Sequence, residues 1–167
     1  MCSSDLLTLL LKHPEQMQTL HDAPELLERA IEEMLRVEPP VQAMPRFIRE
    51  DFTFHGKKLK RNQLALAIIG AANRDPRTFD DPDRFDITRD APPHGGFGYG
   101  VHLCLGIALA RLEARVAFRL LLDYFPRMTL AEPVEWTGPS LVRGVDHLHI
   151  SVTRSSPQKV PIRTQCR

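Results

Sequence analysis

One cysteine of this chain lies in a setting that favours a thiolate ligand. Cys104 falls in the segment 97–106, FGYGVHLCLG, which has glycine at its second, fourth and tenth positions. The apolar pattern that follows predicts a helix from about Leu105, so Cys104 would stand at a helix N-terminus, where peptide dipoles and free N–H groups stabilise negative charge on sulfur. The glycines let the backbone approach a flat or bulky group. A thiolate with this clearance suits the proximal side of an iron porphyrin.

Two other cysteine chemistries fit the segment less well. A zinc site could recruit His94 and His102, but a closed site takes four ligands and no second cysteine lies nearby. A hydrolytic nucleophile would need a histidine base and an orienting group. His102 is too close to Cys104 in the sequence for the usual form of that arrangement.

The elements that must position this segment are mainly helical. Apolar residues at three- and four-residue spacings, with prolines at the boundaries, predict helices at about 5–13, 14–20, 24–38 and 105–125. Alternating patterns predict short strands within 45–69 and weaker ones near 128–131 and 148–152. Period alone does not decide whether the apolar run 64–69 is a strand or a helix start. We therefore expect a mainly α fold with small β-sheets, of the α+β class.

Composition narrows the class of protein. The 167 residues suffice for one domain, and 22 basic against 21 acidic residues leave a formal net charge of +1. We therefore expect neither a nucleic-acid nor a membrane partner. The leucine run near the N-terminus stops at Lys12, and the apolar stretch 105–125 carries five charged residues, so neither predicts a membrane span. Three widely separated cysteines indicate a reducing, cytoplasmic compartment rather than a disulfide framework.

Segment 97–106 resembles the haem-binding signature of the cytochrome P-450 family, F-G-x-G-x-H-x-C-x-G, at every fixed position. Three further stretches follow the family's order: EMLR at 33–36, ANRDP at 72–76, typical of bacterial members, and PDRF at 82–85. The likeness covers about residues 5–152. It predicts a partial cytochrome P-450 domain at 1–152, the haem-proximal C-terminal part of the fold, and a disordered tail at 153–167.

The resemblance implies haem b as the cofactor, with Cys104 as the axial thiolate ligand of its iron. Arg46 and His102 would meet the haem propionates. The alternatives for Arg46 are that Arg49 takes this role and that Arg46 is a plain surface arginine on a strand. Phe97 would pack near the proximal face of the haem, unless it is simply a core residue. The cofactor-binding set implied by the family is Cys104, His102, Arg46, Phe97 and Gly98.

The resemblance also implies a structural ion network of Glu33, Arg36 and Arg84. Glu33 and Arg36 are three residues apart and share a helix face, which by itself usually means a solvated surface pair. With Arg84 the family pattern predicts a buried network that supports folding and haem retention. On the helix 105–125 we expect the leucines in the core and Arg111 and Arg115 exposed, where a redox partner could dock.

The function implied is that of a haem-thiolate monooxygenase, which inserts one atom of O₂ into a small organic substrate. No flavin or nicotinamide motif occurs, so electrons would come from a ferredoxin-type partner and its reductase. Family members are more than twice as long, and their acid–threonine pair and distal helices have no counterpart here. The competing hypotheses are a non-catalytic truncated fragment with weak or no haem binding, and one half of a split enzyme completed by an N-terminal half.

Overall fold

The computed structural model describes residues 3–90, 93–137 and 141–153. Its helices are α1 (Ser3–Leu11), α2 (Pro14–Asp22), α3 (Leu27–Val37), α4 (Ile69–Ala72) and α5 (Ile107–Tyr124), with 3₁₀ turns η1 (Pro24–Leu26), η2 (Gly95–Phe97) and η3 (Gly100–His102). Its strands are β1 (Ala43–Phe47), β2 (Phe52–Phe54), β3 (Lys57–Leu59), β4 (Leu64–Ile68), β5 (Arg127–Leu130), β6 (Trp136–Thr137), β7 (Gly144–Val145) and β8 (Ile150–Thr153). The expected mainly α fold with small sheets is confirmed.

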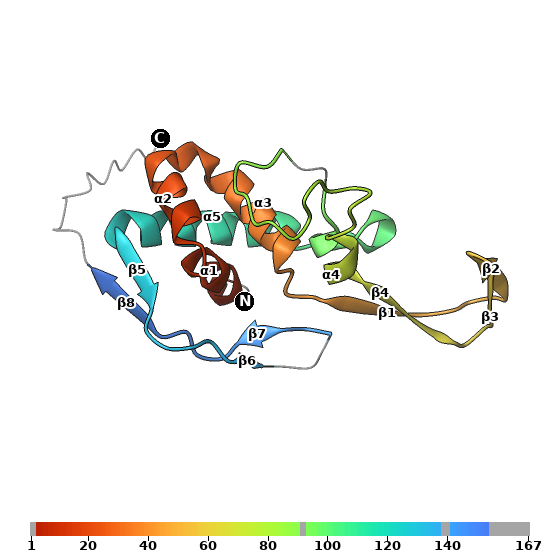
Figure 1. The fold of residues 1–167 in the computed structure, drawn as a ribbon. Coiled ribbons are helices and arrows are strands. Elements are labelled where there is room, and N and C mark those ends of the chain that lie inside the picture. Colours follow the sequence, from red (N-terminus) through yellow and green to blue (C-terminus); the bar gives the residue numbers. More distant parts are fainter. Residues whose placement is uncertain (1–2, 91–92, 138–140, 154–167) are drawn as a thin grey trace, which may run out of the picture.

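The strands form four antiparallel pairs of two strands each: β1 with β4, β2 with β3, β5 with β8, and β6 with β7. Figure 1 shows the β1–β4 ribbon leaving the helical part, with the β2–β3 hairpin at its far end. Pairing with β1, from Ala43 opposite Ile68 to Phe47 opposite Leu64, makes the ambiguous run a strand. Only at Ile69 does the chain turn into α4. Pairing with a partner strand, and not the apolar run itself, therefore decides that this segment is a strand.

The core lies where α1, α3 and α5 meet (Figure 1). Helix α1 buries leucines at positions 6, 7, 9, 10 and 11, so it is apolar on nearly every side, as a helix enclosed by others must be. Helix α3 buries an apolar stripe that includes Ile31 and Met34, and α5 contributes Phe118. Helix α5, which follows the Cys104 loop, is thus anchored in the same core as α1 and α3.

Helix α5 differs from the sequence expectation in which side chains it buries. Ala114, Phe118 and Leu122 face the core, but leucines on the other side of the helix are half exposed or more. The prediction that the leucines are core residues is therefore wrong for Leu109, Leu112 and Leu120. The physical reason is that α5 carries two apolar faces, and only one of them packs against α3 and joins the core cluster in the described residues.

Two further expectations concern the ends of the chain and the membrane. Residues 154–167 of the predicted disordered tail lie outside the described residues, and Thr153 ends strand β8. No helix in the described ranges has both the length and the apolar character needed to cross a bilayer.

Candidate functional site

Cys104 lies on an exposed loop between η2 and α5. Its backbone N–H donates a hydrogen bond of 2.8 Å to the carbonyl of Phe97, the last residue of η2. Its own carbonyl accepts from the N–H of Ile107, at 3.3 Å, where α5 begins. The N–H and the carbonyl of Cys104 are therefore both held by backbone hydrogen bonds, and the residue is exposed to solvent.

Gly98 gives this loop its shape. Its φ angle is +79°, in the region that favours glycine. A Cβ atom at this position would lie 2.6 Å from the carbonyl oxygen of His102, closer than such atoms approach. Gly100 also has a positive φ angle, +59°, but a Cβ there would meet no atom within 4 Å. The glycine at 98 is thus required by both backbone angle and space.

The loop fits the iron porphyrin that the sequence suggests. A cysteine thiolate is a soft ligand for iron, and this thiol is accessible. The residues around it present apolar side chains to the outside, among them Val101, Leu103 and Leu105, the last fully exposed. An exposed thiol with an apolar rim and an open backbone at Gly100 suits a flat, apolar, metal-containing group.

Glu33 and Arg36 form the centre of a buried network. The guanidinium of Arg36 makes two hydrogen bonds to the Glu33 carboxylate, at 2.7 and 2.9 Å, and both side chains are almost fully buried. Its other N–H groups donate to the backbone carbonyls of Asn73, Pro82 and Arg84. All five donors of the guanidinium therefore have acceptors, which offsets the loss of hydration.

The expected third member of this network is wrong. The Arg84 side chain is 63% exposed and pairs with Asp86 at 3.5 Å, so Arg84 contributes only its backbone carbonyl. Arg89 takes the place instead, with Nε 3.1 Å from a carboxylate oxygen of Glu33 and a side chain 13% exposed. Arg84 ends a turn that begins at Asp81, which has a positive φ angle, and its carbonyl faces Arg36 while its side chain is exposed.

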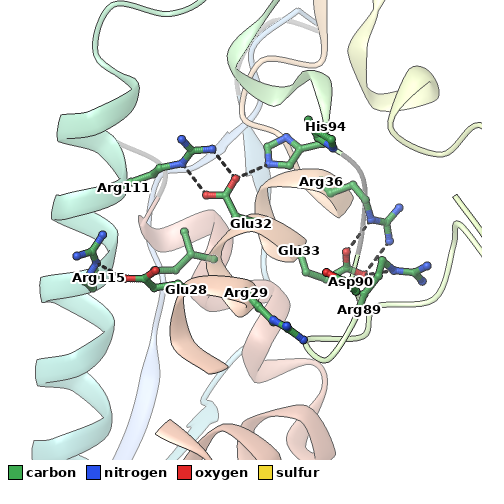
Figure 2. Close-up of a pocket in the computed structure, with 12 residues that line it drawn as sticks. Glu28, Arg29, Glu32, Glu33, Arg36, Arg89, Asp90, His94, Arg111 and Arg115 are labelled. Carbon is green, nitrogen blue, oxygen red and sulfur yellow. Dashed lines mark hydrogen bonds and ion pairs between the residues drawn. The ribbon is translucent and has the colours of Figure 1, made fainter. Parts of the chain in front are cut away.

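A second, partly buried network starts at the neighbouring glutamate, Glu32. Its carboxylate accepts two hydrogen bonds of 2.7 Å from Arg111 on α5, and lies 3.2 Å from Nε2 of His94. Figure 2 shows the three side chains meeting from α3, α5 and the loop before η2. Burial raises the pKa of Glu32, but the hydrogen bonds from His94 and Arg111 outweigh it and lower that pKa to about 2.

Arg111 is therefore not the solvated residue that the sequence suggests. Its side chain is 41% exposed, and its guanidinium also lies over the Phe97 ring, 5.3 Å from the centroid. Arg115, half exposed, contacts Glu28 at 3.3 Å one turn further along the helix. The arginine face of α5 packs toward α3, while its leucine face remains exposed.

Two side chains that sequence analysis did not assign to the site hold η2 in place. Asn73, fully buried, accepts a hydrogen bond of 2.7 Å from the N–H of Gly95 and donates to the carbonyl of Arg36. His94 accepts one of 3.0 Å from the N–H of Gly96 through Nδ1. The only sequence signals were the position of Asn73 in ANRDP and of His94 just before the glycine segment.

The predicted propionate contacts lie on separate elements. Arg46 is partly buried on β1 and donates to the carbonyl of Pro45 at 2.8 Å, while Arg49 is exposed beyond the strand. His102 is exposed at the end of η3. Phe97 packs against the core, as the alternative interpretation of this residue requires. The propionate roles of Arg46 and His102 stay predictions.

A cleft of about 500 Å³ lies between α3, α5 and the loop 89–94. Charged side chains line it, including Glu28, Glu32, Glu33, Arg89 and Arg115 (Figure 2). Cys104 is not among its lining residues. Because the cleft is charged and lacks the thiol, the exposed loop rather than this cleft is the candidate cofactor site.

Comparisons with known proteins agree on one family. The family model described as Cytochrome P450 matches residues 4–135. The chain is 43% identical over 145 residues to 6-deoxyerythronolide B hydroxylase of Saccharopolyspora erythraea, covering 85% of this chain and 36% of that protein. It is 45% identical over 133 residues to the Biotin biosynthesis cytochrome P450 of Bacillus subtilis, covering 80% of this chain and 33% of the relative.

Solved structures give the same result. The complex of P450BioI with a hexadec-9Z-enoic acid-ligated acyl carrier protein superposes with a TM-score of 0.86 at 40% identity, covering 90% of this chain and 39% of that one. Substrate-free CYP109E1 from Bacillus megaterium has a TM-score of 0.88 at 36% identity, covering 91% and 40%. The chain thus spans about a third of the length of these curated relatives.

Proposed function

This chain belongs to the cytochrome P450 family, and we propose that it supplies the haem-thiolate side of a monooxygenase that inserts one atom of O₂ into a small organic substrate. The family's cofactor is haem b, and its members are monooxygenases. The observation that carries the proposal is the Cys104 loop. An exposed thiol follows a glycine-shaped loop, is held by the carbonyl of Phe97, and is followed immediately by α5.

The residues of the loop have distinct roles in this proposal. Cys104 would hold the haem iron through its thiolate, and bound haem would supply the oxygen-activating chemistry, helped by electron donation from sulfur. Gly98 allows the tight loop, and the backbone carbonyl of Phe97 holds the Cys104 N–H while the Phe97 ring packs against the core. Arg46 and His102 would offset the negative charge of the propionates.

The deciding experiment is the carbon monoxide spectrum of the haem-loaded, reduced full chain, beside that of Cys104→Ser. We expect a strongly red-shifted Soret band that the substitution abolishes, because serine does not provide a thiolate. Circular dichroism of the two apo proteins serves as the control for folding. A haem spectrum that is unchanged by Cys104→Ser would contradict the assignment.

As the electron donor of this haem-thiolate site we propose a ferredoxin-type partner and its reductase. The arginines of α5 nearest the site are already engaged, Arg111 with Glu32 and Arg115 with Glu28. Docking of a redox partner would therefore need other charges. Mixing the haem-loaded chain with a ferredoxin and its reductase, and following haem reduction at two salt concentrations, would test this partner.

An exposed apolar stripe supports a further partner, the remaining polypeptide of a cytochrome P450. The stripe runs along α5 through Leu109, Leu112, Val116 and Leu120, each about half exposed. Spacings of three and four residues make it one continuous helix face. The matched part of this chain covers only about a third of each relative's length. Such a face fits the packing of additional helices from an N-terminal half, as in a split enzyme.

Recovered turnover on adding a separately produced N-terminal half would support the split-enzyme form of the proposal. A chain that binds no haem with or without such a half would support the competing hypothesis of a non-catalytic fragment.

A further inference from the structure

A closed ring of contacts links the two ends of the Cys104 loop. The N–H of Cys104 is bound by the carbonyl of Phe97 in η2, and the chain then runs from Cys104 into α5. Four residues into α5, Arg111 binds Glu32 of α3. Glu32 binds His94, and His94 binds the N–H of Gly96, which is back in η2. The two ends of the cysteine loop are thus joined through side chains as well as through the main chain.

The direction of each hydrogen bond fixes the form of the histidine. Nδ1 of His94 accepts from the Gly96 N–H, so it must carry a lone pair. Nε2 then carries the ring proton and donates to Glu32. The ring is 6% exposed, so water does not readily replace either partner. Gly96 also lies close to α3, since a Cβ at this position would be 3.2 Å from the carbonyl of Leu35.

We propose that Glu32, His94 and Arg111 are positioning residues for Cys104, acting by fixing η2 relative to α5. They do not contact the thiol. This proposal rests on the proposed function, because the position of the sulfur determines how it would bind a cofactor iron. The ring of contacts itself is present in the chain without cofactor. If the ring is broken at His94, the carbonyl of Phe97 loses its fixed position and the Cys104 N–H loses its acceptor.

The chain offers a matched control for the ion pair. Glu28 and Arg115 join the same two helices one turn away, with atoms 3.3 Å apart, but both side chains are at least half exposed. Removing that pair perturbs α3 and α5 in the same way without touching the ring. His94→Asn is a second control, because an asparagine oxygen can still accept from the Gly96 N–H.

The experiment is amide hydrogen exchange in the full-length apo chain, read at Gly96, Cys104 and the core residue Met34. For His94→Ala and Glu32→Ala we expect exchange at Gly96 and Cys104 to quicken about tenfold, the factor that one lost net hydrogen bond gives, with Met34 unchanged. Glu28→Ala should leave all three rates unchanged, and His94→Asn should restore most of the protection. Unchanged protection of Cys104 in His94→Ala would overturn the proposal.

A measurement on the unsubstituted chain covers the case in which His94→Ala unfolds. The nitrogen chemical shifts of His94 should identify a proton on Nε2 and none on Nδ1; a proton on Nδ1 would overturn the inference. The carbon monoxide spectrum separates this proposal from the function it rests on. If the parent chain binds no haem but its amides exchange as expected, the proposed function is contradicted and the ring of contacts is still supported. If the thiolate spectrum of His94→Ala equals that of the parent chain, the ring has no role in positioning Cys104.

Discussion

At the scale of single residues, Gly98 and Gly100 allow a direct comparison. Both have positive φ angles, but only Gly98 has a backbone oxygen where a Cβ would be placed. Gly100→Ala should therefore lose only the backbone term, about 1–2 kcal/mol of unfolding free energy. Gly98→Ala should lose more and weaken haem binding, because the loop must move away from the carbonyl of His102. Urea unfolding and haem titration of both variants check this; equal losses would contradict it.

The arginines near Glu33 give a second residue-scale prediction. Arg89→Ala should lower the unfolding free energy by about 2–4 kcal/mol, because it removes a partner from a buried carboxylate. Arg84→Ala should change it by less than about 0.5 kcal/mol, since that side chain is exposed and its carbonyl remains. Urea denaturation distinguishes the two. A larger loss in Arg84→Ala would restore the original assignment of the network.

At the scale of elements, α3 is the part that orders the site. Adjacent glutamates on this helix point to different neighbours: Glu32 to α5 and the loop before η2, Glu33 to the loop 73–89 (Figure 2). Residues one position apart lie about 100° apart around a helix, so two carboxylates can organise two segments. The arrangement explains how one short helix holds both the long loop and the cysteine-bearing helix.

Glu32 makes the link between α3 and α5 dependent on pH. Its pKa is lowered from 4.5 to about 2 in the folded chain, so its contribution to stability is fully present above pH 4.5 and is lost as pH falls toward about 2. The stability difference between the parent chain and Glu32→Gln should therefore shrink over that window. Urea denaturation at a series of pH values measures it. Glu28→Gln, which alters an exposed pair, is the control, and a constant difference for Glu32→Gln would contradict the pKa shift.

At the scale of the whole molecule, we expect the exposed leucine face of α5 to promote self-association in solution. An apolar face of this size on a chain without its partner favours association. Leu112→Lys, at a half-exposed position, should reduce concentration-dependent self-association while leaving the unfolding free energy nearly unchanged. Phe118→Ala, on the buried face of the same helix, should instead lower stability by about 3–5 kcal/mol. Sedimentation and urea unfolding together test the pair; unchanged association in Leu112→Lys would show that another surface is responsible.

The sequence by itself determined the family and the positions of the main helices. Segment 97–106 carries its signature in ten consecutive residues, and α5 follows from apolar spacing bounded by glycine and proline. The pairing of Glu33 with Arg36 was also local, because residues three apart share a helix face. These features depend on neighbours along the chain, so one sequence was enough to find them.

Only the tertiary structure decided which distant residues complete each network. Arg89 rather than Arg84 reaches Glu33, 56 residues away, because the path of the loop between them places the Arg89 side chain inside and the Arg84 side chain in solvent. Glu32 meets Arg111 from 79 residues away. Likewise, α5 has two apolar faces, and periodicity does not tell which one a neighbour covers. Periodicity fixes which residues share a face, whereas the partner of that face depends on how the chain reverses in space.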